Sequence, residues 1–178
     1  MRIYVASSWR NEYQPIVVAR LEALGHEVYD FKNPPGATAG GFHWRELDPN
    51  WQQWDAETYR AALAGPVAQA GFKADMDALR ACDACLLVLP CGRSAHLELG
   101  WAVGAGKKTA VMLFDERDIA GHTLDNNICR GCDPEGGAFV CGLAGRPSVV
   151  PELMYLMCDK IIVSMGELDK WALALAAR

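Results

Sequence analysis

Residues 84–90 read ACLLVLP, a continuous apolar run that ends in a proline. A run of this kind is typical of a parallel strand buried on both faces, whereas a strand with one wet face alternates apolar and polar residues. Residues 94–106 follow it with a helical pattern. This strand, turn and helix predict a sheet covered by helices.

Similar units lie on both sides of this run. Short apolar or β-branched runs predict four more strands, at residues 2–8, 26–31, 109–114 and 160–164. Apolar spacing predicts further helices over residues 16–24, 151–158 and 167–177. The alternation predicts a single α/β domain over residues 1–178. We expect a three-layer flavodoxin-like fold, in which helices cover both faces of a five-stranded parallel sheet of order 2-1-3-4-5.

Composition excludes several classes of protein. The 178 residues are 51% hydrophobic and 22% charged, which is typical of a soluble globular domain. A net charge of -5 makes a nucleic acid polymer or an anionic membrane an unfavourable partner. No apolar stretch is long enough to cross a bilayer, and the first residues do not resemble a signal peptide. We therefore expect a cytoplasmic protein.

Two segments are too long for plain connections and are predicted as insertions. Residues 35–66 are rich in aromatic side chains, and residues 115–147 are rich in glycine. Such segments often form lids or binding loops, or are disordered. Trp51 and Trp54 fit two alternatives, a stack against a base or one face of a short helix packed on the core or on another subunit.

Cysteine usage does not indicate a disulfide framework. The chain has seven cysteines, and Cys82, Cys85, Cys91 and Cys158 lie in or beside predicted core elements, where we expect buried thiols. A structural zinc site is an alternative for the second insertion, which holds four possible ligands: His122, Cys129, Cys132 and Cys141.

The segment PCGRSAHLELGWA, residues 90–102, is the most informative for chemistry. After the buried strand comes a glycine turn, and Ser94 is placed to cap the following helix. Glu98 then falls in or just after the first turn, where the helix dipole would keep its carboxylate ionised for nucleophilic attack. The alternative is that Glu98 only complements the dipole. His96 would point to a different face, and we expect a packing role for it.

This segment, followed by Gly106 and Lys107, resembles the signature of the nucleoside 2-deoxyribosyltransferase superfamily, which includes deoxynucleoside 5'-monophosphate N-glycosidases. The resemblance implies that Glu98 attacks the anomeric carbon of the sugar and forms a glycosyl-enzyme intermediate. It also implies an aspartate on the helix before the third strand, for which Asp75 is the best candidate and Asp77 the alternative. An exposed helix acid remains the structural alternative for Asp75. The second aspartate of the transferases is replaced here by Gly92, which favours the glycosidase branch.

Loops after the first and third strands meet where the strand order reverses, which is where such sheets bind ligands. Guanidinium groups and a helix N-terminus suit a 5'-phosphate. The arginines could instead be solvated, or paired with Asp75 or Glu12. Aromatic residues that end the first two strands are candidates to stack on a base. Together the expected substrate-binding residues are Ser7, Ser8, Trp9, Arg10, Phe31, Gly92, Arg93 and Ser94.

The leading interpretation is an enzyme that cleaves or transfers at the N-glycosidic bond of a nucleotide, expected to be a 2'-deoxynucleoside 5'-monophosphate, without a cofactor or catalytic metal. A TIR-like NAD glycohydrolase and a non-catalytic nucleotide sensor are the alternatives. The resemblance also implies at least a homodimer, and the exposed aromatic residues between positions 42 and 59 are natural contact material.

Overall fold

The computed structural model describes residues 1–35, 40–113 and 152–177, which are built around a five-stranded parallel sheet. Its strands are β1 (Arg2–Ala6), β2 (Glu27–Asp30), β3 (Ala84–Val88), β4 (Lys108–Met112) and β5 (Lys160–Ile162). They lie in the order β2-β1-β3-β4-β5, and each neighbouring pair is parallel. The predicted α/β fold and its strand order are therefore confirmed.

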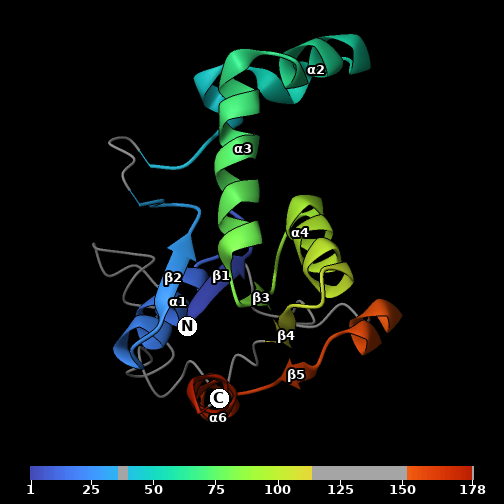
Figure 1. Cartoon of the computed structure of the whole chain (residues 1–178). Coiled ribbons are helices and arrows are strands. Elements are labelled where there is room, and N and C mark those ends of the chain that lie inside the picture. The colour runs from blue at the N-terminus through green and yellow to red at the C-terminus, as the bar shows by residue number, and fades with distance from the viewer. Residues whose placement is uncertain (36–39, 114–151, 178) are drawn as a thin grey trace, which may run out of the picture.

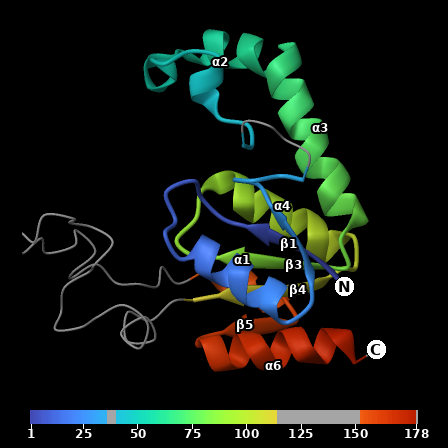
Figure 2. The ribbon, with the colours of Figure 1, turned by 90° about the vertical axis from the view of Figure 1, so that its left-hand side faces the viewer.

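Helices cover both faces of this sheet, as Figure 2 shows. On one face lie α1 (Gln14–Ala23) and α6 (Met165–Ala176). The other face carries α4 (Arg93–Gly104) and the C-terminal part of α3 (Pro66–Ala81). The helices predicted over residues 16–24, 94–106 and 167–177 correspond to α1, α4 and α6.

Strand β3 shows why its sequence is apolar throughout. Ala84, Leu86 and Val88 belong to the core under α1 and α6, whereas Cys85 and Leu87 belong to the core under α3 and α4. All five side chains are fully buried. No position of this strand faces water, so none needs a polar residue.

Helix α3 extends beyond the sheet and carries α2 (Ala56–Leu63) at its far end, as Figure 1 shows. Two short 3₁₀ helices, η1 (Trp44–Glu46) and η2 (Trp51–Gln53), precede α2. The described part of the first predicted insertion is thus a set of short helices that lie next to α3.

The aromatic residues of this insertion pack mainly on one another. Trp44 contacts Trp54 and Tyr59 edge to face, with ring centroids 5.9 and 5.6 Å apart. Trp54 also donates its indole N–H to Asp48 at 2.6 Å. Neither Trp51 nor Trp54 belongs to the two cores on the sheet, so the alternative that they pack on the main core is wrong, while packing on another subunit stays a prediction. Contacts with other aromatic residues of the same insertion already cover much of the surface of Trp51 and Trp54.

The helix predicted over residues 151–158 is instead a 3₁₀ helix, η3 (Leu153–Met157). Tyr155 is its one buried side chain, and Leu153 and Leu156 are 75% and 77% exposed. A segment that buries only one side chain gains too little from packing to stabilise regular α-helical turns.

Two of the four cysteines expected to be buried thiols are buried in the structure. Cys82 and Cys85 are buried free thiols, and Cys91 and Cys158 are half-buried free thiols. The second insertion and its possible zinc ligands, His122, Cys129, Cys132 and Cys141, lie outside the described residues. Among the helices that are described, none has the length and apolar character needed to cross a bilayer.

Candidate active site

The candidate site lies at the edge of the sheet where β1 and β3 end. The order of the strands reverses between these two neighbours, so their connections to α1 and α4 leave on opposite faces. This is the point at which open α/β sheets bind ligands. Residues 7–11 follow β1, and residues 89–92 follow β3.

Asn11 joins these two loops. Its role was not predicted from the sequence. Its side-chain N–H groups donate to the Ser7 hydroxyl at 2.8 Å, to the Val88 carbonyl at 3.1 Å and to the Pro90 carbonyl at 3.0 Å. Its side-chain oxygen accepts the backbone N–H of Tyr13 at 2.7 Å. Asn11 is only 2% exposed, so these bonds form away from competing water. It therefore fixes the loop after β1 against the loop after β3.

Glu98 lies in the second turn of α4, next to β1. Ala95, Leu99 and Ala102 bury the face of α4 that meets the sheet, which leaves Glu98 half-buried at the margin of that face. The Tyr4 hydroxyl forms a hydrogen bond with the Glu98 side chain. Tyr4 is itself 1% exposed, so its hydroxyl holds the carboxyl group from inside the core.

A second tyrosine and carboxyl pair stands beside the first. The Tyr29 hydroxyl donates to Oδ1 of Asp75, on α3, at 2.8 Å. The rings of Tyr4 and Tyr29 are stacked, with centroids 5.2 Å apart and an angle of 18° between their planes. The stack comes from neighbouring positions of β1 and β2, where Tyr4 pairs with Tyr29 in the register of the sheet. Two tyrosines on adjacent strands thus lie next to two carboxyl groups, one from α4 and one from α3.

These surroundings set the ionisation of both acids. Burial, and then the negative charge of Asp75, raise the pKa of Glu98 to about 7, although the Tyr4 hydrogen bond opposes the shift. Burial also raises the pKa of Asp75 against the opposing hydrogen bond of Tyr29. The expectation that the helix terminus keeps Glu98 firmly ionised is therefore wrong, because desolvation and a like charge outweigh the dipole.

The start of α4 also differs from the expectation. Gly92, not Ser94, is the N-cap residue, and it forms no side-chain cap. Ser94 lies in the first turn with its side chain exposed. A Cβ at Gly92 would meet no atom within 4 Å, so there is open space in front of this helix start.

Of the two predicted arginines, Arg10 lies in a loop as expected, whereas Arg93 begins a helix. Arg10 follows β1, Arg93 is the first residue of α4, and both are exposed. Within residues 1–35, 40–113 and 152–177, neither forms an ion pair with Asp75, Glu12 or any other acid. Both guanidinium groups are thus open to solvent at this edge of the sheet.

The serines and aromatic residues of the two loops are partly engaged. Ser7 donates to the Val88 carbonyl at 2.8 Å, and the Ser8 hydroxyl accepts the backbone N–H of Arg10 at 3.3 Å. Trp9 is 40% exposed and meets Phe31 edge to face at 5.5 Å. Ser7 and Ser8 therefore hold the loop, while Trp9 keeps an open surface beside Arg10.

His96 is exposed, but its ring is stacked on that of Tyr155, with the centroids 5.9 Å apart. Its Nδ1 lies 3.1 Å from the Gly92 carbonyl, and its Nε2 lies 2.9 Å from the Tyr155 hydroxyl. Because a carbonyl only accepts, Nδ1 carries the proton in this arrangement and Tyr155 donates to Nε2. Lys107 of the signature is also structural, since its Nζ caps the C-terminus of α3 at the Arg80 and Cys82 carbonyls.

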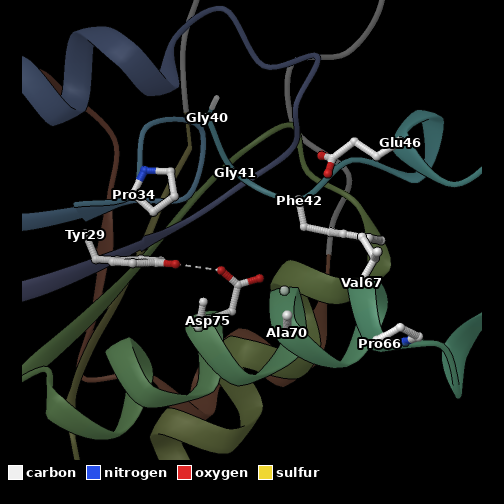
Figure 3. A pocket seen from close by; sticks show the side chains of 12 residues that line it. Tyr29, Pro34, Gly40, Gly41, Phe42, Glu46, Pro66, Val67, Ala70 and Asp75 are labelled. Atoms are coloured by element: carbon white, nitrogen blue, oxygen red, sulfur yellow. Dashed lines mark hydrogen bonds between the residues drawn. The ribbon is translucent and has the colours of Figure 1, made fainter. Parts of the chain in front are cut away.

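A pocket of about 450 Å³ lies beside Asp75 (Figure 3). It is lined by Tyr29, Pro34, Gly40, Gly41, Phe42, Glu46, Pro66, Val67, Ala70, Gly71, Ala74 and Asp75. Glu98 is not among these residues, but the charge of Asp75 acts on both the pocket and Glu98. The part of the chain that the structure describes holds no group of His, Cys, Asp or Glu arranged to bind a metal ion.

Comparison with known proteins gives structural matches only. No protein-family model and no curated protein sequence matches the chain. A 2-deoxyribosyltransferase of Bacillus psychrosaccharolyticus is 23% identical over 63% of this chain and 72% of that chain, with a TM-score of 0.39. The CMP N-glycosidase BcmB of Clostridium botulinum is 18% identical over 98% of this chain and 99% of that chain, with a TM-score of 0.44. A conserved protein from Enterococcus faecalis V583 is 14% identical over 97% and 96% of the two chains, with a TM-score of 0.49. At these identities and scores, none of the three determines the chemistry of this protein.

Proposed function

We propose that this protein cleaves the N-glycosidic bond of a nucleotide, with a 2'-deoxynucleoside 5'-monophosphate as the substrate. The observation that carries the proposal is the pair of half-buried carboxyl groups, Glu98 and Asp75, held side by side by the hydroxyls of Tyr4 and Tyr29. Two acids with shifted ionisation at a ligand-binding edge are typical of enzymes that cleave glycosidic bonds.

Glu98 is the nucleophile in this proposal. Its carboxylate attacks the anomeric carbon of the sugar while the bond from that carbon to the base nitrogen breaks, and the electron pair of that bond leaves with the base. The product is a glycosyl ester of Glu98 and a free base. Water then attacks the same carbon and releases the sugar phosphate and Glu98. The Tyr4 hydroxyl orients the attacking carboxylate throughout.

Asp75 supplies and recovers the proton. Burial raises the pKa of both acids, and the charge of Asp75 helps to raise that of Glu98 to about 7, so the pair retains one proton close to neutrality. When Glu98 attacks as the carboxylate, that proton resides on Asp75, which passes it to the departing base. The Asp75 carboxylate then accepts a proton from the incoming water.

The 5'-phosphate is assigned to the loops after β1 and β3. Arg10 and Arg93 provide open guanidinium groups, and Ser94 lies in the first turn of α4 beside the open space at Gly92. Backbone N–H groups and the dipole of a helix start attract a phosphate. The exposed ring of Trp9, packed on Phe31, forms the apolar border of this region. Gly92, in place of the transferase aspartate, supports hydrolysis in preference to transfer.

A substrate panel tests this function. The protein is incubated with 2'-deoxynucleoside and ribonucleoside 5'-monophosphates, the matching nucleosides, and NAD, and free base is measured by chromatography. We expect base release from 2'-deoxynucleoside 5'-monophosphates. Release of nicotinamide alone would instead establish an NAD glycohydrolase. Thermal stabilisation by nucleotides with no release of any base would indicate a sensor and contradict the proposal.

Arg10→Ala and Arg93→Ala should weaken use of phosphorylated substrates selectively. Loss of a charge-assisted hydrogen bond costs about 1.5–3 kcal/mol, which is roughly a 10- to 100-fold rise in KM for the monophosphate. Turnover of the corresponding nucleoside should stay unchanged, because it has no phosphate to bind. Arg60→Ala, at an exposed position of α2, is the matched control. Equal losses on nucleoside and monophosphate would show that the arginines do not bind phosphate.

A further inference from the structure

The pocket beside Asp75 exists because the first insertion crosses the projecting part of α3. Phe42 approaches α3 at Gly71, where a Cβ would lie 2.6 Å from the Cβ of Phe42. Only glycine allows this close approach without displacing the phenylalanine ring. The pocket therefore lies between α3 on one side and residues 34 and 40–46 on the other, with Tyr29 at its base (Figure 3).

The walls of this pocket suit a flat, uncharged group. Apolar side chains make up most of the lining, namely Pro34, Phe42, Pro66, Val67, Ala70 and Ala74. A volume of about 450 Å³ is within the range of small-molecule sites. The ring of Phe42 offers a face for stacking, and every nucleobase has a face that can stack on it.

The polar side chains of the pocket are those of Tyr29, whose hydroxyl donates to Asp75, and of two acids. Glu46 and Asp75 contribute carboxyl groups, and none of the lining residues is a lysine, arginine or histidine. Oε1 of Glu46 accepts the backbone N–H of His43 at 2.8 Å, which fixes the side chain in a capping box. Oε2 of Glu46 forms no hydrogen bond with any of the described residues, so a ligand placed there meets an open acceptor held in position.

We propose that this pocket binds the base of the substrate and selects bases that carry an exocyclic amino group, such as cytosine and adenine. The proposal rests on the function given above. The base stacks on Phe42 and donates its amino N–H to Glu46, while Asp75 stands between the base and the sugar that Glu98 attacks. A keto oxygen in place of the amino group would face a carboxylate with no hydrogen to donate, and would be rejected.

Paired substrates test this selectivity, because they differ only in the amino or keto group. We expect kcat/KM for dCMP to exceed that for dUMP, and kcat/KM for dAMP to exceed that for dIMP, by at least about 10-fold. In Glu46→Gln the amide can donate as well as accept, so both preferences should fall to within a few fold. Glu57→Gln, on the exposed first turn of α2, should retain them.

Two further variants locate the base. Gly71→Ala should push Phe42 into the pocket and lower kcat/KM for all four nucleotides. Trp9→Ala should leave the amino preference intact. The proposal is overturned if wild type shows no amino preference, if Glu46→Gln keeps it, or if Trp9→Ala abolishes it, since the last result would place the base beside Trp9.

A binding measurement separates this proposal from the proposed function. Calorimetric titration with dCMP and dUMP reports selectivity whether or not either nucleotide is cleaved. Tighter binding of dCMP that is lost in Glu46→Gln supports the pocket even if no base is released, in which case only the proposed catalysis fails. Base release with equal affinity for dCMP and dUMP overturns the pocket assignment and leaves the catalysis standing.

Discussion

Glu98→Gln should reduce base release by roughly 10³-fold or more, because the amide cannot form the glycosyl ester that divides the reaction into two steps. Glutamine has nearly the same size and can still accept a hydrogen bond from Tyr4. Substrate binding should therefore change little, and the loss should appear in kcat. Glu22→Gln, at an exposed position of α1, is the matched control and should retain full activity.

The same substitution should make the fold more stable in alkaline solution. The pKa of Glu98 is raised from 4.5 to about 7 in the folded protein. Below pH 4.5, Glu98 is protonated in both the folded and the unfolded state and does not change the free energy of folding. Between pH 4.5 and about pH 7, its ionisation increasingly favours the unfolded state. Glu98→Gln removes this cost, so its gain in thermal stability over wild type should increase across that range and then stay constant, at roughly 10 °C.

Opposite changes in activity and stability distinguish a functional acid from a structural one. If Glu98 served only to complement the helix, Glu98→Gln would lose stability and keep activity. Undiminished base release by this variant would rule out the covalent mechanism. Lost activity together with a lower melting temperature would contradict the burial and charge repulsion that set the pKa of Glu98.

The fold was predictable because its signals are local. The apolar run of β3 and the helical spacing after it do not depend on distant residues, and together with the other strands they indicate a parallel sheet. The prediction failed at residues 151–158, where an apolar sequence suggested a helix but only Tyr155 found a place in the core. Apolar character alone does not show which side chains will be buried.

The site was predictable only in part, since its decisive contacts join distant parts of the chain. Asn11 bonds to carbonyl groups 77 and 79 positions away, and Tyr29 bonds to an aspartate 46 positions away. One usable signal was present: Tyr4 lies between apolar residues in its strand, and a buried tyrosine hydroxyl requires a partner. The raised pKa of Glu98 was missed for the same reason, because the burial of its carboxyl group and its proximity to Asp75 both depend on distant parts of the chain.

Asp75→Asn should lower kcat/KM by roughly 10²-fold or more and change the shape of its pH dependence. In wild type the active form holds one proton on the carboxyl pair, so kcat/KM should rise as the first proton leaves and fall above about pH 7 as the second leaves. Asparagine has no proton that titrates in this pH range, so the falling limb should disappear. With the neighbouring charge removed, the pKa of Glu98 falls, and the remaining ascending limb should lie below pH 7.

Asp77→Asn provides the control for this profile, because it removes a carboxylate from the same helix without touching Tyr29. Asp77 is exposed and pairs with Lys73 and Arg80 on the surface of α3. Its variant should keep both limbs of the wild-type profile and nearly all of its rate. A falling limb near pH 7 that survives in Asp75→Asn would show that another group protonates the base. A profile altered equally by Asp77→Asn would mean that net charge, and not the Asp75–Glu98 pair, governs the titration.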